Sequence, residues 1–162
     1  MRSRVVLEIF TVTLLVTTSL AATEKVLHSF SDKSGALPDS SVIFDVVGNL
    51  YSTTAYGGSG SCNGGCGTVF ELTPKATGRW TETVLHRFTS SAKDGHYPYA
   101  GLVFDASGNL YGTPAFGGGG SCPDGCGSVF ELTPKAGGGW TEKLLHSFSG
   151  KDGPLCRGCP DP

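Results

Sequence analysis

The sequence predicts an all-β protein made of two four-stranded antiparallel units, which would pack as propeller-type blades of an incomplete β-propeller. Its 25 glycines and 9 prolines indicate frequent turns and leave little room for long helices. Short apolar runs alternate with turn residues, as they do in small sheets. The ten residues FDVVGNLYST at 44–53 also return as FDASGNLYGT at 104–113. A four-stranded unit that repeats along a chain is typical of a β-propeller.

The N-terminal residues 1–21 have the pattern of a signal peptide. MRSR supplies positive charge, the apolar run VVLEIFTVTLLVTTSL follows, and Ser19-Leu20-Ala21 offers small residues for cleavage. A helix is a candidate conformation for this segment. Glu8 interrupts the apolar run, so an uncleaved membrane anchor or a buried strand stays open as an alternative. The pattern predicts a protein that is secreted or held at the cell surface.

The repeated units follow this segment. Residues 45–88 align without a gap on residues 105–148. Extended upstream to include the first strand of each, the units lie at 41–88 and 101–148. The 162 residues are enough for one modest core or for a few small units that share one, but not for two full domains.

Incomplete copies flank the two units. KVLHSF at 25–30 copies the end of a unit and predicts a stray fourth strand of a preceding repeat. FSGKDG at 148–153 resembles the linker after the first unit, and the pattern is then lost. Residues 149–162 are therefore interpreted as an aborted third repeat with a cysteine-containing tail.

Each unit reads as four short strands. In the second unit we expect strands at 101–105, 109–113, 128–133 and 140–148. The first is a continuous apolar run, which predicts an inner strand buried on both faces. The last alternates, which predicts one face made of Trp140, Glu142, Leu144, His146 and Phe148.

Two kinds of turn separate these strands. A hairpin is expected to join the first two strands of each unit. Its aspartate can accept hydrogen bonds from backbone amides, and its glycine and asparagine tolerate left-handed backbone angles. The structural turn residues are Asp45, Gly48, Asn49, Asp105, Gly108 and Asn109. Pro74 and Pro134 end the third strands, since proline lacks the amide hydrogen that a central ladder requires.

The residues GNLYGT, GTVFELTP, WTETVLHRF and KDG, in this order and at this period, resemble the GloVer (Gloeo/Verruco) tandem repeat of exported bacterial proteins. The resemblance spans residues 25–153. It implies a propeller-like fold with no established activity, and it implies longer repeat arrays that often carry a surface-anchoring segment. With two full repeats here, a truncated fragment of a longer repeat protein is one alternative.

Six cysteines occur in three close pairs, and in an exported protein such pairs predict disulfides. The cysteines are Cys62, Cys66, Cys122, Cys126, Cys156 and Cys159. Zinc ligation is the alternative for the two C-x3-C pairs, if neighbouring loops meet. Redox chemistry at the C-x2-C pair is disfavoured, because the βαβ context of a thioredoxin-like motif is lacking.

Other residue patterns are better explained by structural roles than by cofactors. His28, His86 and His146 share one repeat position and are expected to be packed and hydrogen-bonded, with a ring of metal ligands as the alternative. DASGN lacks the residue order of a calcium loop. The glycine tracts lack the G-K-[ST] ending of a phosphate loop. The sequence therefore predicts no metal and no cofactor.

The candidate ligand contacts are aromatic. Tyr56 and Phe116 precede the glycine-rich loops, and Tyr97 and Tyr99 lie in the linker between the units. Exposed aromatic rings on loops could stack on sugar rings, whereas packing between the units is the structural alternative. No catalytic residue is assigned, because G-x-S-x-G and H-E-x-x-H are absent from the sequence.

These observations predict an exported, propeller-like repeat protein that acts as a non-catalytic binding or structural module. Its partner would be an unknown extracellular ligand, with carbohydrate as the candidate. Nucleic acid is excluded as a partner, because the sequence has 12 basic and 14 acidic residues and contains no basic run. The alternative function is a propeller-type enzyme that acts on polysaccharide through clustered carboxylates. Open blade edges also predict self-association.

Overall fold

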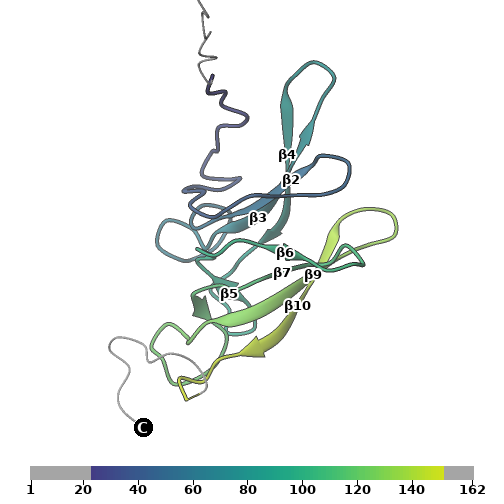
Figure 1. Ribbon diagram of the computed structural model, residues 1–162. Coiled ribbons are helices and arrows are strands. Elements are labelled where there is room, and N and C mark those ends of the chain that lie inside the picture. Colours follow the sequence, from purple (N-terminus) through teal and green to yellow (C-terminus); the bar gives the residue numbers. More distant parts are fainter. Residues whose placement is uncertain (1–22, 152–162) are drawn as a thin grey trace, which may run out of the picture.

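The structure is a computed structural model that describes residues 23–151, and its regular elements are all strands (Figure 1). The first four-stranded sheet contains β1 (Ile43–Phe44), β2 (Leu50–Thr54), β3 (Thr68–Pro74) and β4 (Trp80–Arg87). The second contains β6 (Val103–Phe104), β7 (Leu110–Gly112), β9 (Ser128–Pro134) and β10 (Trp140–Ser147). A two-stranded sheet joins β5 (Gly95–His96) to β8 (Phe116–Gly117). All strand pairs are antiparallel.

The two four-stranded sheets have the same topology. Their strand orders, β1-β2-β3-β4 and β6-β7-β9-β10, both follow the chain. One sheet lies within each predicted unit, at 41–88 and 101–148. Within residues 23–151, no helix has the length and apolar character needed to cross a membrane. The predicted signal peptide at 1–21 and the tail from residue 152, with Cys156 and Cys159, lie outside the described residues.

Prolines mark the ends of the third strands and the turns that follow them. β3 and β9 end at Pro74 and Pro134, where a turn begins that returns the chain into the last strand. In the first of these turns the amide of Lys75 donates to the carbonyl of Arg79 over 2.8 Å. Proline can occupy the last position of each strand because no ladder donor is needed there.

The prediction that 101–105 is an inner strand buried on both faces is wrong. β6 covers two residues and lies at the edge of its sheet. Leu102 is buried, but Val103 is 62% exposed. Successive side chains of a strand point to opposite faces, and only one face of β6 has a neighbouring sheet.

The predicted single face of the last strand is also wrong. Leu144 pairs with Phe130 and His146 pairs with Val129, so Leu145 is an extra residue in the ladder. This β-bulge shifts the alternation, and His146 therefore leaves the face that carries Trp140, Glu142 and Leu144. β4 has the same irregularity, because Phe70 pairs with Val84 and Val69 pairs with His86.

Residues 25–30 pair with no strand of the described chain, although the repeat predicts a strand there. They lie instead against the first sheet. The Phe30 ring packs on the edge of Phe70 at 4.8 Å, and Lys25 Nζ donates to the carbonyl of Gly78 over 3.0 Å. The segment thus contributes side-chain contacts but adds no strand to a sheet.

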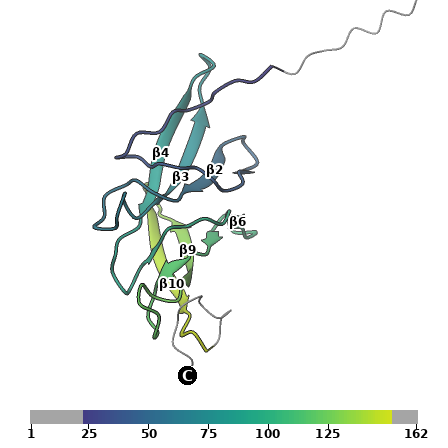
Figure 2. The same ribbon diagram turned by 90° about the vertical axis from the view of Figure 1, so that its left-hand side faces the viewer.

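The two sheets pack face to face, one beneath the other (Figures 1 and 2). We call the faces of each sheet leading and trailing: the trailing face of the first sheet contacts the leading face of the second. The shared core consists of Tyr51, Val69 and Phe88 with Leu110, Phe130 and Leu132. The aromatic contacts are edge-on, with ring centroids 5.0 Å apart for Tyr51 and Phe104 and 5.3 Å apart for Phe88 and Phe130.

Candidate functional site

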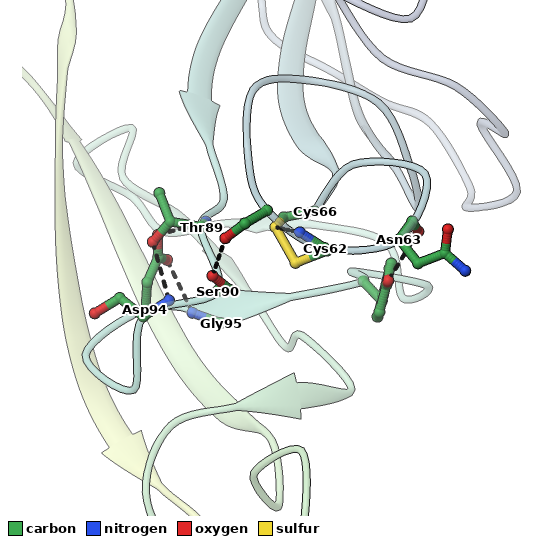
Figure 3. Close-up of a disulfide and its surroundings, with 10 residues drawn as sticks. Cys62, Asn63, Cys66, Thr89, Ser90, Asp94 and Gly95 are labelled. Atoms are coloured by element: carbon green, nitrogen blue, oxygen red, sulfur yellow. Dashed lines mark hydrogen bonds between the residues drawn. A yellow bond between two sulfur atoms is a disulfide. The ribbon is translucent and has the colours of Figure 1, made fainter.

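Two glycine-rich loops project from one end of the stacked sheets, and each is closed by a disulfide. Cys62 is joined to Cys66, and Cys122 to Cys126. These two bonds fit the prediction of disulfides and favour an oxidising compartment. Figure 3 shows Cys62–Cys66 between Asn63 on one side and the turn around Asp94 on the other.

The glycines of these loops allow close approach of backbone segments. Gly65 and Gly125 have φ angles of 86° and 80°, which side-chain-bearing residues rarely adopt. A Cβ atom at either position would overlap the backbone of Gly57 or Gly117. The tracts therefore hold the loop folded back on itself, in keeping with a structural role.

The aspartate hairpins are built identically in the two sheets. Asp105 Oδ1 accepts the amides of Ser107 and Asn109 at 2.8 and 2.9 Å, and Asp45 does the same for Val47 and Asn49. The Asn109 amide is the main cause that lowers the pKa of Asp105 below its ordinary 3.8. Burial opposes the corresponding hydrogen bonds at Asp45, but they outweigh it and its pKa is also lowered.

These lowered pKa values predict a loss of stability in acid. A carboxylate with a depressed folded-state pKa stabilises the fold above its unfolded pKa, and the contribution disappears as pH falls through the folded value. We expect the free energy of unfolding to fall less steeply below about pH 4 in Asp105→Asn than in the parent chain. Urea unfolding at a series of pH values measures this, and parallel pH profiles would contradict it.

A tyrosine links two carboxylates in each sheet. The hydroxyl of Tyr111 lies 3.1 Å from Asp105 Oδ2 and 2.9 Å from Glu131 Oε1, and Tyr51 is placed likewise near Asp45 and Glu71. The hydrogen bond to Glu131 is the main cause that raises the pKa of Tyr111 to about 12. The aspartate accepts the turn amides, and the tyrosine hydroxyl, which has one proton, lies within hydrogen-bond distance of both the aspartate and the glutamate. This arrangement tethers the hairpin to the third strand.

All four predicted aromatic residues gather in one cluster beside the loops. The Tyr97 ring lies 5.0 Å from Tyr56, 6.4 Å from Tyr99 and 5.9 Å from Phe116. The hydroxyls of Tyr56 and Tyr99 are 3.0 Å apart, and this hydrogen bond is the main cause that raises the pKa of Tyr99 to about 12. Tyr99 is 43% exposed and Phe116 is 36% exposed.

A cleft of about 590 Å³ lies between the two disulfide-closed loops. Tyr97 and Phe116 line it, whereas Tyr56 and Tyr99 stand behind Tyr97 and are not among its lining residues. Asn63 and Asp124 are among its lining residues and carry an amide and a carboxylate side chain. The Tyr97 hydroxyl donates to the carbonyl of Asn63 over 3.0 Å, which fixes that ring against the first loop.

His96 also lines the cleft, and sequence reasoning missed it. Its ring stacks on Phe116 with centroids 5.8 Å apart, and its Nδ1 atom is buried without a hydrogen-bond partner. Burial lowers the pKa of His96, against the opposing effect of Asp124 and Asp94. The signal was present in the repeat: ALPD at 36–39 becomes HYPY at 96–99.

The three repeated histidines have packing roles. Each ring meets the edge of the phenylalanine two residues later, at 4.8 Å for His28, 4.7 Å for His86 and 4.8 Å for His146. His86 Nε2 also lies 3.3 Å from Asp94 Oδ1, and His28 Nε2 lies 3.1 Å from Glu82 Oε2. Across residues 23–151, no three His, Cys, Asp or Glu side chains are grouped to hold a metal ion.

The chain is similar to a known family of repeat proteins. No match to the chain was found among curated proteins or among solved structures. The family model described as the Gloeobacter/Verrucomicrobia repeat matches residues 9–158, which is most of the chain. The repeat in the sequence and the two equivalent sheets agree with this match, and the chain belongs to the Gloeobacter/Verrucomicrobia repeat family.

Proposed function

We propose that the chain is an exported repeat module, with its sheets acting as propeller-type blades, that binds an extracellular carbohydrate in the cleft between its disulfide-closed loops. The observation that supports this is the aromatic lining formed by Tyr97 and Phe116 beside polar groups of Asn63 and Asp124. Binding clefts commonly combine apolar walls with a few fixed polar groups. The faces of sugar rings would pack on the aromatic rings, and their hydroxyls would bond to the amide and carboxylate.

The loops favour a preformed cleft. Each is held by a disulfide and packed through glycines, so that little ordering would accompany binding. The ring of Tyr97 is also restrained by its hydrogen bond to the first loop. A rigid scaffold that carries exposed loop residues is a common arrangement in binding proteins.

A binding role is favoured over hydrolysis. Hydrolysis of a glycosidic bond ordinarily uses two carboxyl groups on either side of the scissile bond. Asp124 is the one carboxylate among the described residues that line the cleft. Of the carboxylates near Tyr51 and Tyr111, the aspartates accept turn amides and the glutamates lie within hydrogen-bond distance of the tyrosine hydroxyls.

Replacing Phe116 with alanine is expected to weaken polysaccharide binding about tenfold, because one exposed ring that lines the cleft is lost. Affinity electrophoresis against soluble β-glucan, chitin oligomers and peptidoglycan fragments would measure it. Val46→Ala is the matched control, because Val46 is fully exposed and lies outside the cleft. Equal retention of the two variants, or no retention of the parent chain by any of these polymers, would overturn the carbohydrate proposal.

Export through residues 1–21 predicts that the disulfides form outside the cytoplasm. The secreted, unreduced protein should therefore show no labelling of Cys62, Cys66, Cys122 and Cys126 by a thiol reagent, with labelling restored after reduction. Peptide mass spectrometry assigns each site. Labelling of either pair before reduction would count against the oxidising location.

A further inference from the structure

The packing between the two sheets is a repeated interface that is open at both ends of the described chain. We infer that a second copy of the chain docks on it head to tail, with the trailing face of the second sheet of one copy against the leading face of the first sheet of the other. The surfaces involved are the sheet faces, not the open edges that the sequence predicts. This inference is independent of any ligand in the cleft.

The trailing face shows this opening most clearly. In the first sheet, Tyr51 and Val69 are 6% and 0% exposed because the second sheet covers them. Their repeat counterparts in the second sheet, Tyr111 and Val129, are only half-buried. Leu145, whose counterpart Leu85 packs against the shared core from the trailing face of the first sheet, is 43% exposed. A face that is core in one repeat is thus left on the surface in the next.

The leading face of the first sheet also has exposed apolar side chains, at the positions that would meet the trailing face of the second sheet. Phe104 of the second sheet is half-buried and packs on Tyr51. Its counterpart in the first sheet, Phe44, is 60% exposed, and Val42 beside it is 49% exposed. Large apolar side chains at this level of exposure, gathered on one sheet face, mark a contact surface.

The internal interface supplies the register of the docked pair. Tyr51 contacts Phe104 and Trp140, with ring centroids 5.0 and 6.4 Å away. Shifted by one repeat, the same contacts join Tyr111 of one copy to Phe44 and Trp80 of the other. Each of these residues is identical to its counterpart in the internal interface. The two exposed faces can therefore make the same contacts as the internal interface, and they are complementary.

Residues 25–30 compete for part of this surface. Phe30 packs on Phe70 much as Phe88 packs on Phe130, so a docking copy would bring Phe148 toward the place of Phe30. An open groove of about 310 Å³ lies between part of this segment and the sheet, and Leu50, Phe70 and Leu72 are among its lining residues. This loose cover would move aside as the concentration of the chain rises, and association should be strengthened by Phe30→Ser.

A complementation experiment tests the inference. Phe44→Glu places a charge on the leading face, and Leu145→Glu places one on the trailing face. Val46→Glu is the control, because this fully exposed residue lies in a hairpin turn. Sedimentation velocity on the exported, disulfide-bonded chain should show assemblies for the parent and the control. Each face variant alone should be monomeric, and their equimolar mixture should form a one-to-one dimer.

The mixture distinguishes head-to-tail docking from the alternatives. Each face variant keeps one intact face, and the two intact faces match only if the interface joins unlike surfaces. A mixture that remains monomeric would overturn the inference. So would a parent chain that remains monomeric at the highest concentration attainable, or a Phe44→Glu variant that associates like the parent.

Discussion

Replacing Phe130 with alanine is expected to lower the free energy of unfolding by about 3–5 kcal/mol. Phe130 is 1% exposed and packs edge-on against Phe88, at the centre of the core between the two sheets. Removal of its ring would leave a cavity that the paired strands on both sides cannot close. Urea denaturation of the disulfide-bonded chain, followed by near-ultraviolet circular dichroism, measures the loss.

Phe70→Ala is the matched control, because Phe70 occupies the same position in the first sheet. The Phe30 ring packs against it, next to the open groove of about 310 Å³. The segment around Phe30 can settle onto the sheet, so we expect about half the loss seen for Phe130. Equal losses would contradict the view that one leading face is covered by a sheet and the other by a short segment.

Replacing Asp94 with alanine is expected to lower the free energy of unfolding by about 2 kcal/mol, because it leaves several donors unpaired in a partly buried turn. Asp94 as a whole residue is 8% exposed. It accepts the Thr89 amide at 2.9 Å, the Thr89 hydroxyl at 3.0 Å and the Gly95 amide at 2.8 Å (Figure 3). The turn it closes leads directly into β5 and the cleft. Thermal unfolding and binding by the same preparation would be measured together.

Asp94→Ser tests whether a shorter hydrogen-bonding side chain can hold the turn. The corresponding residue before the first unit is Ser34, whose hydroxyl lies 3.4 Å from the amide of Ser31 and makes a smaller version of the same turn. We expect Asp94→Ser to recover part of the stability lost in Asp94→Ala. If both variants unfold like the parent chain, the carboxylate does not hold the turn.

The elements that the sequence predicts well are those fixed by neighbouring residues. Asp105 and Asn109 form their hairpin through contacts four residues apart, and Pro134 ends β9 for a reason that is also local. The β-bulge at Leu145 was not predicted, because the extra residue becomes apparent only against the partner strand β9. The exposure of Val103 likewise depends on which face meets a second sheet.

Some features of the candidate site can be predicted from the sequence, whereas others depend on strand pairing. The aromatic character of Tyr97 and Phe116 is plain in the sequence, but their meeting at one cleft depends on the pairing of β5 with β8, which brings together segments from either side of two strands. His96 enters the cleft through that pairing, as the partner of Phe116. Comparing the segments that precede the two units position by position would have identified it, because Ala36 stands at the position of His96 before the first unit.

The protein consists of two equivalent sheets stacked trailing face on leading face, and interproton contacts between aromatic rings test this arrangement most directly. In a labelled Phe44→Glu chain, which should be monomeric, we predict nuclear Overhauser contacts between Tyr51 and Phe104 and between Phe88 and Phe130, whose ring centroids are 5.0 and 5.3 Å apart. Spectra in which both hairpins are folded but neither contact between the sheets is present would contradict the account.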